Sequence, residues 1–307
     1  MLYILIYTDN TQKKRGKEGR KLEMIKADQL SVKLESFSLK DISFVLPTGY
    51  ITGLIGCNGA GKTSLLNTIL GIHKPQKGIL QLFGETYESS EKKIRQETGW
   101  VLGADLFCAK LTLEENASLY GSLYDRYDGT VFARYCELFS LDGRSRLGKL
   151  SKGEYLKFQL AFALAHDPKL LILDEPMANF DPEFRKQFLK IITRFVEDGA
   201  HSCLIASHLL KDLERVADYV MMLQNGRLLF MEEWERLTEQ YRLLGGEDYL
   251  IRKLPKDKVI SVEKGEYGTK ALVQHTAYSA YEAGLAVRIP TLEEIMYFIS
   301  RKGDGTC

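Results

Sequence analysis

The sequence predicts an α/β fold organised around a parallel sheet. Residues 51–70 comprise an apolar strand pattern (ITGLI), a glycine-rich turn (GCNGAGKT) and a helical run that ends near Gly71. The segments LLIL at 170–173 and CLIA at 203–206 are short and apolar, as expected for strands buried on both faces of a parallel sheet. Helical patterns follow at 183–197 and 212–217, and this alternation is typical of α/β proteins.

The composition limits the possible functions. The chain has 307 residues, of which 45% are hydrophobic, so it can bury one sizeable core and a smaller appendage. Its net charge of +1 supplies no general field for nucleic acid, and no nucleic-acid partner is expected. No apolar run reaches the ~18 residues of a membrane-spanning helix. The five cysteines lack C-x-x-C zinc spacing. We expect a cytoplasmic chain that reaches a membrane only through a partner.

Three regions are predicted along the chain. Residues 1–23 form a charged N-terminal extension, 24–244 form the main domain, and 245–307 form a small α+β C-terminal accessory region. The main domain includes a helical subdomain over about 104–167. Its predicted strands lie at 24–26, 30–34, 39–46, 78–83 and 100–102, its helices at 91–97, 113–124, 131–139 and 155–165, and a hairpin surrounds Asn225-Gly226. The C-terminal region has predicted strands at 259–262, 271–274 and 285–288, and a helix at 292–300.

The glycine-rich turn has the pattern of a phosphate-binding loop. Its three glycines let backbone N–H groups turn inward, and the next helix adds the positive end of its dipole. Lys62 is placed to reach the β- and γ-phosphates of a nucleotide, and the Thr63 hydroxyl to bind Mg²⁺. The candidate phosphate-binding residues are Gly56, Cys57, Asn58, Gly59, Ala60, Gly61, Lys62 and Thr63.

Two consecutive carboxylates form the second part of the predicted site. Asp174 and Glu175 follow the buried strand at 170–173, at its carboxyl end. Asp174 can hold Mg²⁺, and Glu175 can orient or deprotonate an attacking water. Phosphoryl transfer depends on positioning and charge neutralisation more than on covalent chemistry, so these groups suffice for it.

Five motifs in one order resemble those of ATP-binding subunits of ABC transporters. GCNGAGKT resembles the Walker A motif, LSKGE at 150–154 stands where the family has its LSGGQ signature, and LLILDEP at 170–176 resembles Walker B. ANFD at 178–181 stands at the D-loop, and Ser207-His208 at the switch histidine. The resemblance covers roughly residues 24–230 and is more specific than a single motif.

The resemblance implies the fold of the P-loop NTPases of the ABC type, with an antiparallel β subdomain and a helical subdomain. It implies that the chain binds ATP and Mg²⁺ and hydrolyses ATP. It also implies a head-to-tail dimer with a second copy or a paralogous subunit, in which Ser151 and Gly153 of one subunit cap the γ-phosphate bound by the other.

Individual roles follow from the same resemblance. Ser64 is expected to contact the α-phosphate, and Glu175 to act as the general base. His208 is expected to hold the γ-phosphate, and Asp181 to couple the two sites. Lys62, Glu175 and His208 are therefore the predicted catalytic residues, and Thr63 and Asp174 the predicted metal ligands.

Several positions depart from the family pattern. Gly103 stands where the family usually has a Gln that senses Mg²⁺ and the membrane partner; Asp105 aligns there only with an insertion. The adenine-stacking aromatic falls near Leu34, and Phe37 is the nearest aromatic residue. Lys152 and Glu154 replace the usual Gly and Gln of the signature.

The leading hypothesis is an ATPase subunit that powers a separate membrane permease, at the inner face of the cell membrane. LSKG, the displaced Gln and the tail TLEEIM at 291–296 resemble the bacterial exporters of drugs and peptide antibiotics. Two alternatives remain: a soluble ABC ATPase that acts on ribosomes or DNA, and a degenerate cassette that binds ATP without appreciable turnover. The chain has one cassette and no heptad run, which weakens the first; Lys62, Asp174, Glu175 and His208 weaken the second.

Overall fold

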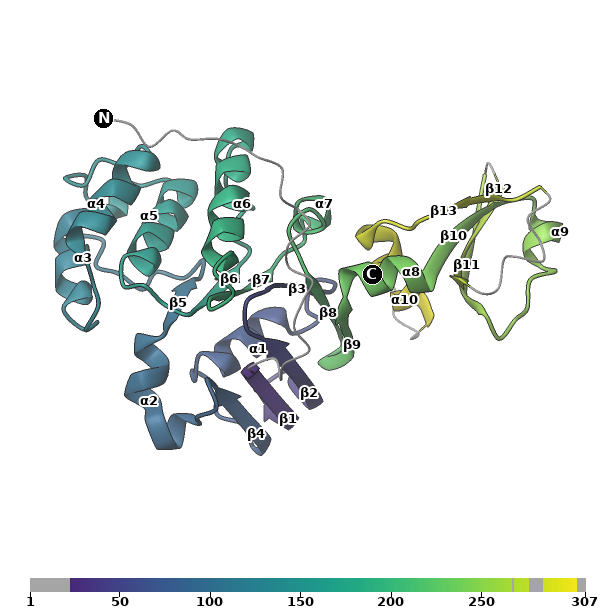
Figure 1. Cartoon of the computed structure of the whole chain (residues 1–307), viewed down its shortest axis with the longest axis horizontal. Helices are drawn as coiled ribbons and strands as arrows, with labels where there is room; N and C mark the ends of the chain where they lie inside the picture. The colour runs from purple at the N-terminus through teal and green to yellow at the C-terminus, as the bar shows by residue number, and fades with distance from the viewer. Residues whose placement is uncertain (1–22, 267, 276–283, 303–307) are drawn as a thin grey trace.

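The computed structural model describes residues 23–266, 268–275 and 284–302 (Figure 1). The predicted extension at 1–23 lies outside this part except for Glu23, which begins the first strand. None of the helices within the described ranges combines the length and the apolar character that a membrane span requires.

A six-stranded sheet forms the centre of the molecule. Its strand order is β5-β6-β7-β3-β8-β9, and all neighbours are parallel except the hairpin of β8 and β9. The predicted α/β fold is thereby confirmed. The strands are β3 (Ile51–Ile55), β5 (Thr98–Val101), β6 (Leu170–Asp174), β7 (Ser202–Ala206), β8 (Tyr219–Gln224) and β9 (Arg227–Glu233).

Both faces of the central sheet are buried, as the apolar strand patterns predict. In β6, Leu171 and Leu173 belong to a core shared with α5 and α6, whereas Leu170 and Ile172 belong to a core shared with α1 and the antiparallel sheet. This alternation places α5 and α6 on one face and α1 with the β subdomain on the other (Figure 1). The helices next to this sheet are α1 (Lys62–Ile69), α2 (Tyr87–Gln96), α5 (Lys152–Leu164), α6 (Pro182–Val196) and α7 (Leu210–Leu213).

An antiparallel sheet of three strands makes up the β subdomain. Its order is β2-β1-β4, with β1 at Glu23–Lys33, β2 at Ser38–Pro47 and β4 at Lys77–Leu82. The two strands predicted at 24–26 and 30–34 are one strand with register shifts between Ala27 and Leu30 and between Leu30 and Val32.

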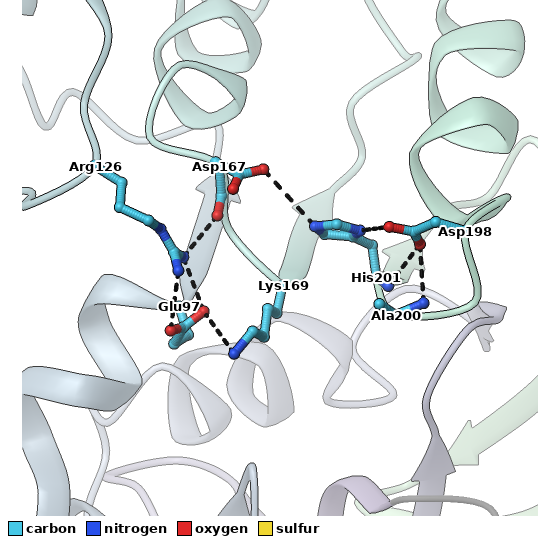
Figure 2. A network of polar contacts seen from close by, with 7 residues as sticks. All are labelled: Glu97, Arg126, Asp167, Lys169, Asp198, Ala200 and His201. Carbon is cyan, nitrogen blue, oxygen red and sulfur yellow. Dashed lines mark hydrogen bonds and ion pairs between the residues drawn. The ribbon is translucent and has the colours of Figure 1, made fainter.

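The helical subdomain contains α3 (Leu113–Gly121), α4 (Gly129–Leu138) and a short 3₁₀ turn at Leu147–Lys149, packed against α5. A polar network ties it to the central sheet (Figure 2). The Arg126 guanidinium donates to both carboxylate oxygens of Glu97, at 3.3 and 2.9 Å, and to the Asp167 carbonyl at 2.7 Å. Lys169 Nζ lies 3.5 Å from the same Glu97 carboxylate. These contacts anchor the subdomain near the C-terminal end of α5, the end opposite Ser151.

The C-terminal region forms a separate sheet of order β11-β12-β10-β13 at one end of the molecule (Figure 1). Its elements are α8 (Trp234–Gln240), β10 (Tyr241–Gly246), α9 (Asp248–Ile251), β11 (Val259–Gly265), β12 (Gly268–Gln274), β13 (Ala286–Arg288) and α10 (Leu292–Lys302). The predicted strands and terminal helix of this α+β appendage are all present. Its sheet includes β10, which begins at Tyr241, ahead of the predicted start at 245.

Two predicted helices are misplaced. The helix predicted at 91–97 is α2, which begins four residues earlier at Tyr87. The helix predicted at 212–217 begins two residues earlier, and α7 covers only Leu210–Leu213. Residues 214–217 continue as hydrogen-bonded turns, with the amides of Val216 and Ala217 donating to the Leu213 carbonyl at 3.1 and 2.9 Å. No side chain caps the start of α7 at Leu209, so the sequence carries no cap signal that marks its first residue.

Candidate functional site

The glycine-rich turn connects β3 to α1 in a conformation that its glycines make possible. Gly59 and Gly61 have φ values of 78° and 106°, in the left-handed region that a side chain disfavours. Gly61 is the N-cap of α1 and Gly56 faces the Leu223 carbonyl, which a Cβ would approach to 2.3 Å. Within the turn, the Ala60 amide donates to the Cys57 carbonyl at 3.1 Å. The loop therefore has the strand–turn–helix context predicted for anion binding.

Lys62 lies within this loop rather than pointing into solvent. It is 8% exposed, and its Nζ donates to the carbonyls of Gly56 and Cys57 at 2.8 and 3.3 Å. Burial lowers the pKa of Lys62, although the charges of Glu175 and Asp174 oppose the shift. The buried ammonium thus holds the loop backbone through these hydrogen bonds and lies near the carboxylates of Glu175 and Asp174.

Thr63 and Asp174 are in direct contact. The Thr63 hydroxyl donates to Asp174 Oδ2 at 2.7 Å. Burial raises the pKa of Asp174, and the neighbouring Glu175 charge adds to the increase, while the Thr63 hydrogen bond and Lys62 oppose it. The raised pKa of Asp174 therefore reflects mainly the loss of water around its carboxylate, with the Glu175 charge as a further cause.

Glu175 and His208 form the other side of the site. His208 Nδ1 lies 2.7 Å from Glu175 Oε2, and the His208 amide donates to the same oxygen at 3.2 Å. Glu175 has φ 48°, an unfavourable value for a glutamate, and its amide donates to the Ala206 carbonyl at 2.9 Å. Strain at a single residue costs on the order of 1–3 kcal/mol and is common where a side chain must be aimed.

Sheet topology explains why these residues meet. β3, β7 and β6 are adjacent and parallel, and Gly56, His208 and Asp174 lie at or just beyond their carboxyl ends. Ligands of open α/β sheets bind at this edge. The half-buried Ser64 lies in the first turn of α1, and Asn58 is exposed at the outer part of the loop.

Ser151, Gly153 and Asp181 occupy a second location. Ser151 is the N-cap of α5, and a Cβ at Gly153 would approach the Asn179 carbonyl to 2.5 Å. Asp181 is the N-cap of α6 and lies 3.7 Å from Lys157 Nζ. The signature turn and the D-loop therefore pack together, and the contacts described for these three residues do not join them to the phosphate loop.

Ser151 and Glu154 form a capping box. The Ser151 hydroxyl and amide donate to Glu154 Oε2 at 2.7 and 2.8 Å, and the Glu154 amide donates to Ser151 Oγ at 3.3 Å. These hydrogen bonds lower the pKa of Glu154. Glu154, which stands where the family has Gln, is therefore stabilised locally, because its carboxylate caps the helix.

Two predicted departures can now be placed. The Phe37 ring packs against Gly61, where an added Cβ would lie 2.7 Å from its edge. Phe37 thus borders the loop, whereas Leu34 makes a backbone turn with it through a 2.8 Å hydrogen bond. Gly103 is exposed, and a Cβ there would have no atom of the described chain within 4 Å.

Two side chains of α5 near this site belong to none of the sequence motifs. Gln159 is fully buried and Tyr155 is half-buried, and both bind the backbone near Gly103. The signal for Gln159 was present, since it is the one amide within the apolar run FQLAFAL at 158–164. A buried side-chain amide normally has hydrogen-bond partners, so such a residue predicts a specific backbone contact.

Comparison with known proteins agrees with this geometry. The family model described as ABC transporter matches residues 39–178. The bacitracin transport ATP-binding protein BcrA of Bacillus licheniformis is 30% identical over 207 residues, which cover 67% of this chain and 68% of the relative. The Nod factor export ATP-binding protein I of Burkholderia orbicola is 32% identical over 213 residues, covering 68% and 67%.

A solved ATP-binding subunit of an ABC transporter superposes with a TM-score of 0.64 at 25% identity, over 70% of this chain and 91% of that one. The sequence relatives thus show the family, and the structural neighbour shares the fold over most of this chain. This chain belongs to the ABC transporter family, as an ATP-binding subunit that hydrolyses ATP.

Proposed function

We propose that the residues gathered at the carboxyl ends of β3, β6 and β7 bind and hydrolyse ATP in the roles predicted from the sequence. The observation that carries this proposal is the pair of 2.7 Å contacts that join Thr63 to Asp174 and His208 to Glu175. They bring side chains from distant parts of the chain to the phosphate loop. The loop backbone from Gly56 to Gly61 and the Lys62 ammonium hold the β- and γ-phosphates, and Ser64 contacts the α-phosphate.

The residues present fit a magnesium ion. Within the described ranges, no three His, Cys, Asp or Glu side chains are grouped so as to hold a metal. A site made of Asp174 and Thr63 alone suits Mg²⁺, which keeps water and takes phosphate oxygens to complete its shell. When bound, Mg²⁺ would neutralise charge that develops on the phosphates.

Glu175 and His208 act at the γ-phosphate. Glu175 accepts the proton of the attacking water as the water oxygen bonds to the γ-phosphorus and the bond to ADP breaks. The contact of His208 with Glu175 Oε2 orients this carboxylate, and the exposed imidazole edge is free to meet the γ-phosphate. Positioning of this kind supplies much of the rate enhancement in phosphoryl transfer.

A second subunit completes the site. Ser151 and Gly153 lie at the N-terminus of α5, where amides favour anions. Facing another copy, or a paralogous subunit, they cap the γ-phosphate held by its loop, and Asp181 links the two sites through the D-loop. The packing of Gly153 on Asn179 supports such a link, because movement of one turn displaces the other.

The membrane partner is a permease, and the direction is export. ATP-binding subunits of this family work with membrane components, so the chain acts at the inner face of the cell membrane through that partner. Relatives named for bacitracin transport and Nod factor export support an exporter of a drug, peptide or antibiotic-like substrate. The permease would select that substrate.

The function is tested by Lys62→Ala in the full chain. ATP affinity measured by calorimetry should fall at least about tenfold, because a charge-assisted contact to phosphate contributes about 1.5–3 kcal/mol. Lys190→Ala, which removes an exposed lysine of α6, is the control. Unchanged ATP affinity in Lys62→Ala would contradict the proposal. Purification from solubilised membranes separately tests the partner: a co-purifying permease supports transport, and co-purifying ribosomes support the alternative.

A further inference from the structure

The side-chain amide of the buried Gln159 on α5 forms hydrogen bonds with the backbone of a neighbouring loop. Its Oε1 accepts from the Leu102 amide at 2.8 Å, and its Nε2 donates to the Ala104 carbonyl at 3.3 Å. The side chain is fully buried, so the bond to the Leu102 amide is shielded from water, whereas the bond to the exposed Ala104 is partly shielded. Gln159 therefore fixes the start of the segment 102–106, which contains Gly103.

Tyr155 holds the same segment one helical turn earlier. Its hydroxyl donates to the Ala104 carbonyl at 3.1 Å and accepts from the Leu106 amide at 3.0 Å. Residues four apart on a helix share a face, so Tyr155 and Gln159 grip the loop from one side of α5. We call this pair the α5 clamp.

No side-chain contact described for the segment 102–106 joins it to the phosphate loop. At position 103 there is only a hydrogen atom, and Asp105 is exposed. The hydrogen bonds described for this segment run to α5. The next residue, Phe107, also packs on α5, with its ring 4.9 Å from that of Phe158.

The other end of this connection is the signature turn. Tyr155 is one turn from the N-cap, and its amide donates to the Ser151 carbonyl at 2.9 Å. α5 runs without a break from Lys152 to Leu164, so a shift of the loop moves the helix and its N-terminus together. A cavity of about 690 Å³ separates the two ends, lined in part by Gly103, Asp105, Tyr155 and Ser151.

We propose that Tyr155 and Gln159 are positioning residues that couple the 102–106 loop to Ser151 and Gly153. Through them the loop position is transmitted to the ATP held by the opposing subunit, in place of a side-chain contact with the metal of its own site. This inference rests on the proposed function, because it needs the two-subunit site.

Hydrogen exchange by mass spectrometry tests the coupling in the full chain. The parent is Glu175→Gln, which should retain ATP. ATP should slow exchange in the peptides covering 150–158 and 102–107. In the parent with Tyr155→Phe and Gln159→Met, the ATP-induced slowing at 150–158 should persist, while that at 102–107 should fall about fivefold or more, the factor that one net hydrogen bond contributes.

The measured quantity is the difference in exchange with and without ATP. If Tyr155 and Gln159 only stabilise the fold, their replacement raises exchange in the absence of ATP but leaves this difference unchanged. Tyr135→Phe removes a hydroxyl from α4 in the same subdomain and is the matched control. Tyr155→Phe alone keeps the test valid should the double variant unfold. An undiminished response at 102–107, or no response there in the parent, overturns the inference. No response at 150–158 in the parent instead contradicts the two-subunit site.

Discussion

His208 Nδ1 lies 2.7 Å from Glu175 Oε2, and the His208 amide donates to that same oxygen at 3.2 Å. His208, two residues after the end of β7, thus fixes the orientation of the Glu175 carboxylate, which follows β6. Glu175 itself has a positive φ, so its orientation depends on this outside support.

His208→Ala should therefore reduce ATP turnover without preventing ATP binding. We expect turnover to fall on the order of 10²-fold, since a misoriented general base loses most of its contribution. Steady-state phosphate release and nucleotide affinity are measured together. His201→Ala, at an exposed pair with Asp198, is the control. Equal turnover in both variants would disprove the role of His208.

Asp174→Asn should weaken the binding of the Mg²⁺ that ATPase activity requires. Burial raises the pKa of Asp174, and the Glu175 charge adds to the increase, so the carboxylate lies poorly hydrated beside a like charge. Removing the charge should raise the Mg²⁺ concentration for half-maximal ATPase activity about tenfold, as expected for loss of one charged ligand contact. Asp257→Asn, in the C-terminal region, is the control. A Mg²⁺ titration that superposes on the parent would exclude Asp174 as a ligand.

Glu154→Gln should strengthen ATP-dependent association. The Glu154 carboxylate accepts a 2.7 Å hydrogen bond from the Ser151 hydroxyl and so places a negative charge where the γ-phosphate of the opposing subunit is proposed to bind. Glutamine retains an acceptor for the cap without the charge. The ATP concentration for half-maximal dimerisation of Glu175→Gln should fall about two- to tenfold. Glu137→Gln is the control; an increase in that concentration would refute the placement.

Folding stability should decline as the pH falls from 6.5 towards 4. Burial lowers the pKa of His166 from 6.5 to about 4, and its ring stacks on Tyr124 at 4.0 Å. Below pH 6.5 the unfolded chain binds a proton that the native site excludes, so the free energy of unfolding falls. His166→Phe should remove about 2 kcal/mol of the stability loss between pH 7 and pH 5. Urea unfolding at both values measures this, and an identical pH dependence in the two proteins would contradict it.

The phosphate loop and the buried strands could be predicted because local chemistry determines them. Gly59 and Gly61 occupy backbone conformations that favour glycine, and the apolar residues of β6 are needed on both faces of the sheet. The adjacency of Asp174 and His208 also follows, since parallel strands present their carboxyl ends together.

Other features depend on tertiary packing. The helix α7 has no capping side chain, and so its start could not be located. The four α5-clamp hydrogen bonds end on main-chain atoms of 102–106, which no side-chain motif records. The Ser151–Glu154 capping box matches a general pattern for the start of a helix. Compared with the family motif, however, Glu154 is seen only as a replacement of Gln.

In the proposed function, ATP joins two copies of this chain, each completing the site of the other. Light scattering coupled to size-exclusion chromatography of Glu175→Gln tests it most directly. The mass should double with ATP and stay unchanged with ADP, and the dimer should be lost when Lys62→Ala is added. A Glu175→Gln chain that binds ATP but stays monomeric would contradict it.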